Sequence, residues 1–227
     1  MDSQAKQQQH IIPLYQAAVK LTKPRPLSLT EKPFVRFCLN IAISDSHGTA
    51  LQLLRQQQGF NTNMLLYICW QSLRQHGRFK LVEIRDTLQA ICLWRESIVR
   101  PLEYIVEDLQ GLTNVNAVEI RKHVEVELKQ ADIVEKCMLS DIVLSRSYLL
   151  RSTEQQLQDM CHGVSVYARI LSAKLLADDI ELFVKLFQSL LPDLCPKKVS
   201  AMTREKLQKV ATDFDYGYSQ LPLTLAV

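Results

Sequence analysis

Residues 61–76, which read NTNMLLYICWQSLRQH, are the most informative stretch of the chain. From Met64 to Trp70 every side chain is aliphatic, aromatic or sulfur-containing, so a helix formed here has no polar face. Asn61 is a favourable N-cap residue, and Gly77 can end the helix. Because a helix without a polar face must be surrounded by other helices, the stretch predicts the central helix of a multi-helix bundle.

The composition of the whole chain agrees with this prediction. The chain has 6 glycines and 8 prolines among its 227 residues. This combined share is about half of the roughly 12% that glycine and proline make up in an average protein. Sandwiches and barrels of many short strands need turn residues far more often. Hydrophobic residues make up 47% of the chain, which excludes a wholly disordered protein. We therefore expect an all-α fold with no significant β-sheet.

Upstream of the central helix, the apolar spacing predicts two further helices. Thr30 is a suitable N-cap for the first, which carries Phe34 and Ile41 on one face. Residues 44–48, with the sequence SDSHG, read as a turn before the second. Gly59 is a candidate for the end of that second helix.

Downstream, a helix over 81–94 is expected, and its apolar period continues to residue 109. Pro101 marks either the first turn of a restarted helix or a kink. After a turn at 111–114 comes a long helix that extends towards Leu150 unless Ser140 or Asp141 interrupts it. Its stripe of residues expected to be buried consists of Ala117, Ile120, Val124, Leu128 (or Glu127), Ala131, Val134 and Met138.

The last third of the chain predicts three more helices. Ser152 or Thr153, with a glutamine three residues later, forms a capping box for the first of them. Asp178 or Asp179 caps the second, which Pro192 stops. The third covers about residues 197–212.

These expectations divide the chain into four parts. Residues 1–29 form an N-terminal arm with a proline-containing linker, because Pro24 and Pro26 disfavour helix in the residues before them. Residues 30–150 form a helical domain, and residues 151–215 form C-terminal helices packed on it. Residues 216–227 form an apolar tail.

Charge, hydropathy and cysteine spacing limit the protein's surroundings. The net charge is +3 without a strong basic cluster, so no nucleic-acid partner is predicted. No stretch of 18 apolar residues is present, so membrane insertion is not expected. The six cysteines are widely spaced, which favours reduced thiols over a disulfide framework or a zinc site. We expect a cytoplasmic protein, although a transit peptide is a second interpretation of the acid-poor N-terminus.

Two segments resemble a known pattern. Residues 58–66 read QGFNTNMLL and residues 94–102 read WRESIVRPL, with Trp70 between them. Together they resemble an uncharacterised proteobacterial family of small helical proteins, a domain of unknown function with the pattern G-[LF]-D-x-N-x-L-L, then Trp, then W-R-x-x-x-[VI]-x-P-L. The resemblance covers about residues 30–110 and departs at Asn61, where the family has Asp, and at Glu103, where a basic residue is common. It implies a helical fold and a bacterial cytoplasmic protein.

The matching residues also suggest a candidate ligand site. The start of the central helix offers free N–H groups to an anion such as a phosphate or a carboxylate, and a nearby arginine would strengthen binding. The alternative is a structural role, in which the same residues form a helix cap and a buried hydrogen-bond network. The candidate ligand-binding residues are Asn61, Asn63, Trp70, Trp94 and Arg95.

Other groupings of reactive residues are weaker evidence for a metal or catalytic site. Glu119, His123 and Glu127 share one helix face, but they supply only part of a metal ligand set, so no metal or other cofactor is predicted. Residues 44–48 contain the residue types of a hydrolytic triad, and Cys161 precedes His162. Neighbours in one turn or one helix rarely reach the geometry that catalysis needs. No catalytic residue is therefore predicted.

The C-terminal tail suggests protein binding. Leu225 and Val227 are two residues apart, a spacing that suits a partner's groove or sheet edge, while packing on the tail's own domain is the alternative. The leading hypothesis is a non-enzymatic helical interaction protein (an adaptor, a chaperone-like subunit or a regulator) that binds another protein. The alternative is a small-molecule-binding or enzymatic helical protein with its site near Asn61, Asn63, Trp94 and Arg95.

Overall fold

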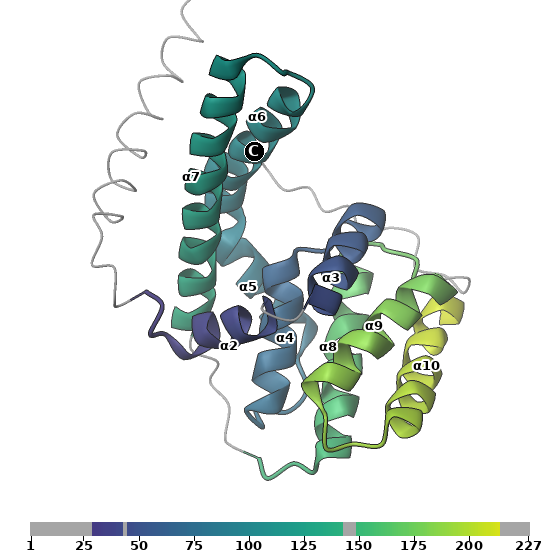
Figure 1. The fold of residues 1–227 in the computed structure, drawn as a ribbon. Helices are drawn as coiled ribbons and strands as arrows, with labels where there is room; N and C mark the ends of the chain where they lie inside the picture. The colour runs from purple at the N-terminus through teal and green to yellow at the C-terminus, as the bar shows by residue number, and fades with distance from the viewer. Residues whose placement is uncertain (1–28, 43–44, 143–148, 214–227) are drawn as a thin grey trace, which may run out of the picture.

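The computed structural model describes residues 29–42, 45–142 and 149–213, and these ranges contain helices and no strand (Figure 1). The predicted all-α bundle without β-sheet is confirmed. The elements, with the π-helical turn labelled η1, are α2 (Pro33–Ala42), α3 (Asp45–Gln58), α4 (Thr62–Leu73), α5 (Leu81–Trp94), η1 (Arg95–Val99), α6 (Arg100–Gln110), α7 (Val115–Asp141), α8 (Thr153–Ile170), α9 (Ala177–Leu190) and α10 (Pro196–Asp213).

Helix α4 is the predicted central helix. Asn61 caps it, because Asn61 Oδ1 accepts a hydrogen bond from the Met64 N–H at 2.9 Å. All residues from Asn63 to Ser72 are buried. Burial on every side requires neighbours on every side, and α2, α3, α7 and α8 all contact α4.

The end of α4 differs from the prediction. The helix ends at Leu73 and does not continue to His76. Gln75 adopts a left-handed conformation with φ of 63°, and the His76 N–H donates to the Gln71 carbonyl at 3.2 Å. This hydrogen bond satisfies a carbonyl of the last turn and reverses the chain, as a Schellman ending does. Gly77 follows with φ of 75°.

One hydrophobic core connects the two halves of the chain. It extends from Phe34 on α2 to Leu207 on α10, with the residues of α4 between them. Gly163 lets α8 pack closely on α4, since a Cβ atom there would lie 2.5 Å from Ile68 Cγ2. Helix α9 packs on α3, and α10 packs on α8 and α9 (Figure 1). The division of the chain into domains stays a prediction.

Helices α5 and α6 are joined through η1 without an interruption. The Arg100 N–H donates to the Arg95 carbonyl five residues back, which widens the helix into a π turn. Pro101 explains the widening, because proline has no N–H for the carbonyl four residues earlier and its ring crowds that carbonyl. The structure therefore has a π turn where the sequence left open a restarted helix or a kink.

Helices α6 and α7 form a long antiparallel hairpin, called here the α6–α7 hairpin (Arg100–Asp141). In Figure 1 the two helices lie side by side and extend away from the other helices. No residue of α6 is buried. The prediction that Ile120 is buried is wrong, because its side chain is 53% exposed. Ala117 and Ala131 are buried as predicted.

Two helix starts on the N-terminal side also differ from the prediction. Helix α2 begins at Pro33 and not directly after Thr30, since proline is favoured in the first turn, where its missing N–H costs nothing. Helix α3 begins at Asp45, so residues 45–48 belong to that helix. Gly59 does follow the end of α3, with φ of 71°.

On the C-terminal side the capping box is confirmed. The Gln155 N–H donates to Ser152 Oγ at 3.3 Å, and the Ser152 N–H donates to Gln155 Oε1 at 3.0 Å. The cap of α9 is Leu176, whose N–H donates to Asp179 Oδ2 at 2.8 Å. Asp179 thus supports the helix start from its third position and does not cap it.

Residues 1–28 of the expected arm and residues 214–227, with Leu225 and Val227 of the expected tail, lie outside the described residues. Among the helices of the described ranges, none combines the length and apolarity needed to cross a membrane.

Candidate functional site

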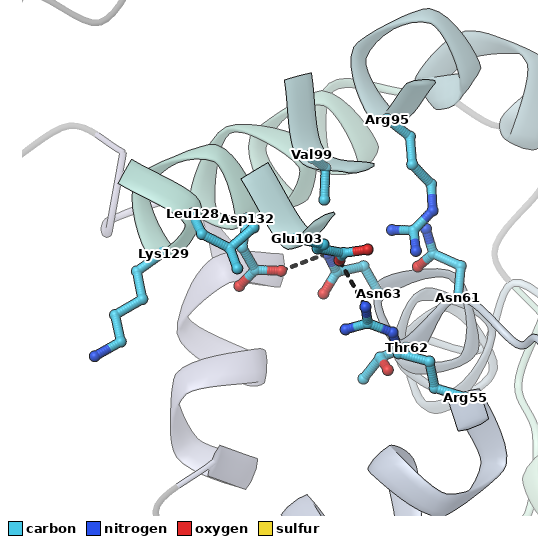
Figure 2. Close-up of a pocket in the computed structure, with 10 residues that line it drawn as sticks. All are labelled: Arg55, Asn61, Thr62, Asn63, Arg95, Val99, Glu103, Leu128, Lys129 and Asp132. Atoms are coloured by element: carbon cyan, nitrogen blue, oxygen red, sulfur yellow. Dashed lines mark hydrogen bonds and ion pairs between the residues drawn. The ribbon is translucent and has the colours of Figure 1, made fainter. Parts of the chain in front are cut away.

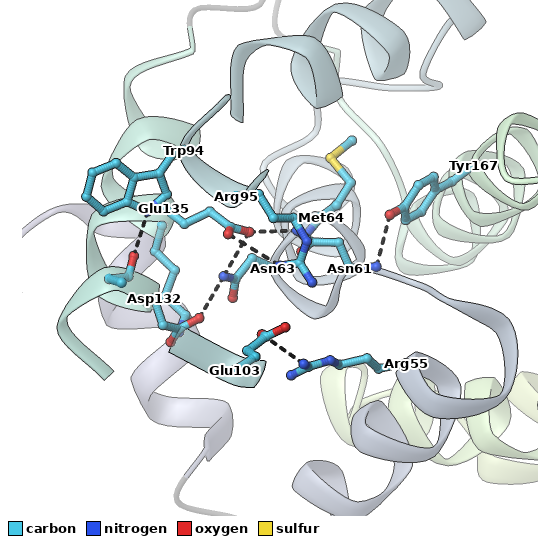
Figure 3. A network of polar contacts seen from close by, with 12 residues as sticks. Arg55, Asn61, Asn63, Met64, Trp94, Arg95, Glu103, Asp132, Glu135 and Tyr167 are labelled. Carbon is cyan, nitrogen blue, oxygen red and sulfur yellow. Dashed lines mark hydrogen bonds and ion pairs between the residues drawn. The ribbon is translucent and has the colours of Figure 1, made fainter. Parts of the chain in front are cut away.

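Three of the five candidate ligand residues (Asn61, Asn63 and Arg95) contact one carboxylate, and Trp94 lies beside it (Figure 3). Asn61 and Asn63 lie at the start of α4, and Trp94 and Arg95 lie where α5 becomes η1 (Figure 3). The carboxylate belongs to Glu135 of α7. Asn61 is positioned by its role as the cap of α4. Arg95 lies in the π turn before Pro101. The ends of these two elements lie next to each other, beside α7 (Figure 3).

The Glu135 carboxylate is completely buried and has three partners. Its Oε1 atom accepts hydrogen bonds from Asn61 Nδ2 at 2.7 Å and from Asn63 Nδ2 at 3.2 Å. Its Oε2 atom lies 3.5 Å from Arg95 Nη1. A buried charge is costly unless it is paired and hydrogen-bonded. The two amides and the guanidinium compensate it, so the arrangement has a structural role in fixing how the helices cross.

The same network continues to both sides of Glu135. Trp94 Nε1 donates to the Ala131 carbonyl of α7 at 3.0 Å. The Asn61 N–H donates to the Tyr167 hydroxyl of α8 at 3.0 Å. Burial raises the pKa of Tyr167 to about 12, so the hydroxyl keeps its proton at neutral pH. We call the residues Asn61, Asn63, Trp94, Arg95, Glu135 and Tyr167 the Glu135 network.

Trp70, the fifth candidate, lies away from this network. Its indole packs on Phe34, with ring centroids 5.2 Å apart, and on Tyr67, with centroids 6.0 Å apart. The Arg74 guanidinium lies 4.8 Å from the centre of the Trp70 ring. Seven residues, or about two helical turns, separate Trp70 from Asn63. The structure therefore gives Trp70 a place in the aromatic core.

A polar pocket opens beside the Glu135 network. Its volume is about 200 Å³. Arg55 of α3 and Glu103 of α6 form an ion pair in its wall, with Nη2 and Oε1 2.8 Å apart (Figure 2). Asn63 Nδ2 also donates to Asp132 Oδ1 at 2.8 Å. The pocket is lined by Arg55, Asn61, Thr62, Asn63, Arg95, Val99, Glu103, Leu128, Lys129 and Asp132.

Sequence reasoning missed Glu135, Asp132 and Arg55. A signal for Glu135 was present, because it lies four residues after Ala131, on the face of α7 that was expected to be buried. A carboxylate on a buried face must find partners. Asp132 and Arg55 carry no comparable signal, since charged residues on helices usually face solvent.

The other reactive residues are not assembled into a site. Glu119, His123 and Glu127 are exposed on α7. In the described ranges no group of three or more His, Cys, Asp and Glu side chains could hold a metal ion. Burial raises the pKa of the Cys161 thiol to about 12, and the neighbouring His162 is hydrogen-bonded through Nε2 to the Phe79 carbonyl at 3.1 Å. The side chains of the possible hydrolytic triad at residues 44–48 lie outside the part of the chain whose side chains the structure describes.

The chemistry available in the pocket is that of charge and hydrogen bonding. Its wall presents guanidinium groups from Arg55 and Arg95 and carboxylates from Glu103 and Asp132, whereas the Lys129 side chain points away from these groups (Figure 2). The first turn of α4 adds N–H groups that have no acceptor within the helix. These groups can bind a small polar molecule.

Comparison with protein-family models, curated protein sequences and solved structures finds no match for the chain. The resemblance of residues 30–110 to the uncharacterised helical family therefore stays a hypothesis.

Proposed function

We propose that the chain is a non-enzymatic helical interaction protein that binds another protein in the cytoplasm, as an adaptor, a chaperone-like subunit or a regulator. The α6–α7 hairpin is the binding surface in this proposal. The observation that carries it is the exposure of apolar side chains on the hairpin.

Six of the fourteen large hydrophobic side chains that are exposed in the described ranges lie between residues 104 and 126. Val115 is 75% exposed and Tyr104 is 62% exposed. Concentrated apolar exposure is typical of surfaces that bind a partner. These apolar hairpin residues are Tyr104, Ile105, Leu112, Val115, Ile120 and Val126.

The packing of α6 supports the same proposal. It lies along α7 and continues from η1, and none of its residues is buried. A partner that covered its outer side would remove apolar surface from water, which is worth about 25 cal/mol per Å² before the costs of association. Burial of this exposed apolar surface would therefore stabilise a complex between the hairpin and a partner.

The charge of the hairpin indicates the chemistry of the partner. Residues 103–128 contain six acidic and two basic residues, a net charge of −4 with histidine neutral, although the whole chain has +3. A partner segment with basic residues beside an apolar stripe is complementary to this surface. A second copy of the hairpin would bring like charges together. We therefore propose a basic amphipathic helix of another protein as the partner segment.

Site-specific photo-crosslinking in the source cells tests the proposal. A photoreactive residue at Val115 or Val126 should capture a single partner protein, whereas the same residue at Leu176, an exposed apolar position at the start of α9, should not. The purified partner should then lose binding to the double variant Val115→Glu, Val126→Glu. Its affinity for the unaltered chain should fall with added salt, because the complementary charges are screened.

Two results would contradict the proposal. One is capture of the same proteins from the hairpin positions and from Leu176. The other is full binding of the purified partner to the double variant. Thermal unfolding of the double variant controls for folding, and its midpoint should stay close to that of the unaltered chain because both valines are exposed.

A further inference from the structure

One face of α7 is exposed along most of the α6–α7 hairpin. Glu119, His123 and Glu127 follow one another along it at intervals of four residues. Exposed apolar side chains flank them, Val126 on one side and Ile120 on the other. At about 100° per residue, the residues of this face fall within about a third of the helix circumference. We call it the outer face of α7, and its exposed residues are Asn116, Glu119, Ile120, His123, Val126, Glu127 and Gln130.

The described chain begins at the end of this same face. Cys137 and Asp141 continue the face toward the C-terminus of α7. Cys137 Sγ donates to the Leu29 carbonyl at 3.7 Å, and Lys32 forms an ion pair with Asp141. Helix α2 packs on this end of α7 (Figure 1). Residues 1–28 are therefore joined to the structure beside the outer face.

Residues 1–28 are long enough to reach the whole outer face. Cys137 and Asn116 are 21 residues apart, which is about 32 Å along a helix at about 1.5 Å per residue. A segment of 28 residues spans about 42 Å as a helix and more when extended. Docking within one molecule also has a high effective concentration, on the order of millimolar. A second copy of the chain has no such advantage.

The sequence of residues 1–28 complements the outer face. It contains four basic residues and one acidic residue, a net charge of +3 with histidine neutral. Three of the basic residues lie between positions 20 and 25, and the outer face offers the carboxylates of Glu119 and Glu127. The segment also has apolar residues at helical spacing that can cover Ile120 and Val126. These apolar residues are Ile11, Leu14, Ala18 and Leu21.

The C-terminal residues 214–227 are less suitable for this face. They contain Asp215 and no basic residue, so they have no positive charge to pair with its carboxylates. They also follow α10, which packs on α8 and α9. Charge and position both favour the N-terminal segment.

From this arrangement we infer that residues 11–25 dock on the outer face of α7 of the same molecule. The docked segment covers Ile120 and Val126, which belong to the apolar hairpin residues, so a partner protein must displace it. The segment thus acts as an internal competitor for the hairpin. This regulatory consequence rests on the proposed function, whereas the docking itself needs no partner.

Photo-crosslinking within the purified full chain tests the docking. A photoreactive residue at Leu14 should form crosslinks to residues 116–130, which mass spectrometry can locate. The crosslinked product should have the mass of one chain. Added salt should lower the yield, because it screens the attraction between exposed charges.

Charge reversal on the hairpin identifies the face that the segment uses. In the crosslinking chain, the double variant Glu119→Lys, Glu127→Lys should lower the yield at least about threefold, because it turns attraction into repulsion. Glu107→Lys, Asp108→Lys is the matched control, since it makes the same change in net charge at exposed positions of α6. It should leave the yield unchanged. All four positions are exposed, so the midpoint of thermal unfolding should stay close to that of the unaltered chain.

Each contrary result overturns the docking. Crosslinks to other elements, or no crosslinks, show that residues 11–25 do not lie on the outer face. A product with the mass of two chains shows that the occupant is a second copy. An equal loss of yield in the two double variants shows that net charge, and not the outer face, attracts the segment.

Partner affinity separates the docking from the proposed function. Leu14→Glu in the full chain weakens docking, so it should raise the affinity for the partner of the hairpin at least about threefold. An unchanged affinity overturns the competition. If the crosslink forms while the hairpin captures no partner, the proposed function fails and the docking stands. If a partner binds the hairpin while the crosslink is absent, the docking fails and the proposed function stands.

Discussion

Asn61 and Glu135 are 74 residues apart in the chain, yet Asn61 Nδ2 donates to Glu135 Oε1 at 2.7 Å. Asn61 also caps α4 through its Oδ1 atom. One asparagine therefore starts the central helix and ties it to α7. Because Arg95 reaches the other oxygen of the same carboxylate, Glu135 connects α4, η1 and α7 at the base of the α6–α7 hairpin.

Replacing Glu135 with alanine should strongly destabilise the fold. The change leaves the Asn61 and Asn63 amides without their acceptor and the partly buried Arg95 without its counter-charge. Removing one partner of a buried pair costs about 3–5 kcal/mol. Since Arg95 is 21% exposed and can be hydrated, we expect a loss of about 3 kcal/mol in the free energy of unfolding, measured with urea.

Glu127→Ala is the matched control for that experiment. Glu127 is exposed on the same helix, so its replacement should change the free energy of unfolding by less than about 0.5 kcal/mol. If Glu135→Ala were as mild as Glu127→Ala, the Glu135 network would not hold the helices together.

Helix caps could be predicted from the sequence, whereas contacts between helices distant in the sequence could not. The caps at Asn61 and Ser152 were predicted correctly because each depends on residues three positions away. Glu135 was missed because its partners are set by how α4 and α7 cross, and no local pattern encodes that crossing. The error at Ile120 has a similar cause: periodicity identifies an apolar face but does not say whether another helix covers it.

Gly163→Ala should destabilise the crossing of α4 and α8. A Cβ atom at this position would lie 2.5 Å from Ile68 Cγ2 and 3.5 Å from Phe79 Cδ2. Alanine gains up to about 1 kcal/mol in helix propensity over glycine, but overpacking a dense core costs about 1–3 kcal/mol. We therefore expect a net loss of up to about 2 kcal/mol in urea unfolding.

Two further variants identify the cause of that loss. Gly111→Ala should be close to neutral, because a Cβ atom at Gly111 would meet nothing within 4 Å. Ile68→Ala removes the clashing methyl group, so Gly163→Ala should cost less in that background than in the unaltered chain. If Gly163→Ala instead cost the same free energy of unfolding in both backgrounds, a clash with Ile68 would not be the cause of the loss.

Ser172→Gly should stabilise the protein. Ser172 follows α8 with φ of 54°, and the Ala173 N–H donates to the Ala168 carbonyl at 2.9 Å. A left-handed conformation costs a non-glycine residue about 1 kcal/mol or more. Glycine adopts it freely but loses more entropy on folding, so we expect a gain of about 0.5–1 kcal/mol in thermal unfolding experiments. Ser172→Ala keeps the strain and should give no gain, and an equal effect of both variants would refute the argument.

His162 should make the stability of the fold sensitive to mild acid. Burial lowers the pKa of His162 below its ordinary value of 6.5, and Arg78 and Arg169 act in the same direction, whereas the Phe79 carbonyl and Asp159 oppose it. Below about pH 6.5 the unfolded chain therefore binds a proton more readily than the folded chain does. The contribution of His162 to stability is complete above that pH and falls as the pH drops through this window.

The variant His162→Gln isolates this contribution. Glutamine keeps an amide donor for the Phe79 carbonyl, which His162 Nε2 contacts at 3.1 Å, but it does not titrate. The free energy of unfolding should be measured in urea at about pH 7.5, 6.5 and 5.5 for both proteins. Relative to His162→Gln, the unaltered chain should lose up to about 1.4 kcal/mol in the free energy of unfolding for each pH unit below 6.5. The other histidines cancel in this difference, so a value that stays constant with pH would show that His162 is not the sensitive group.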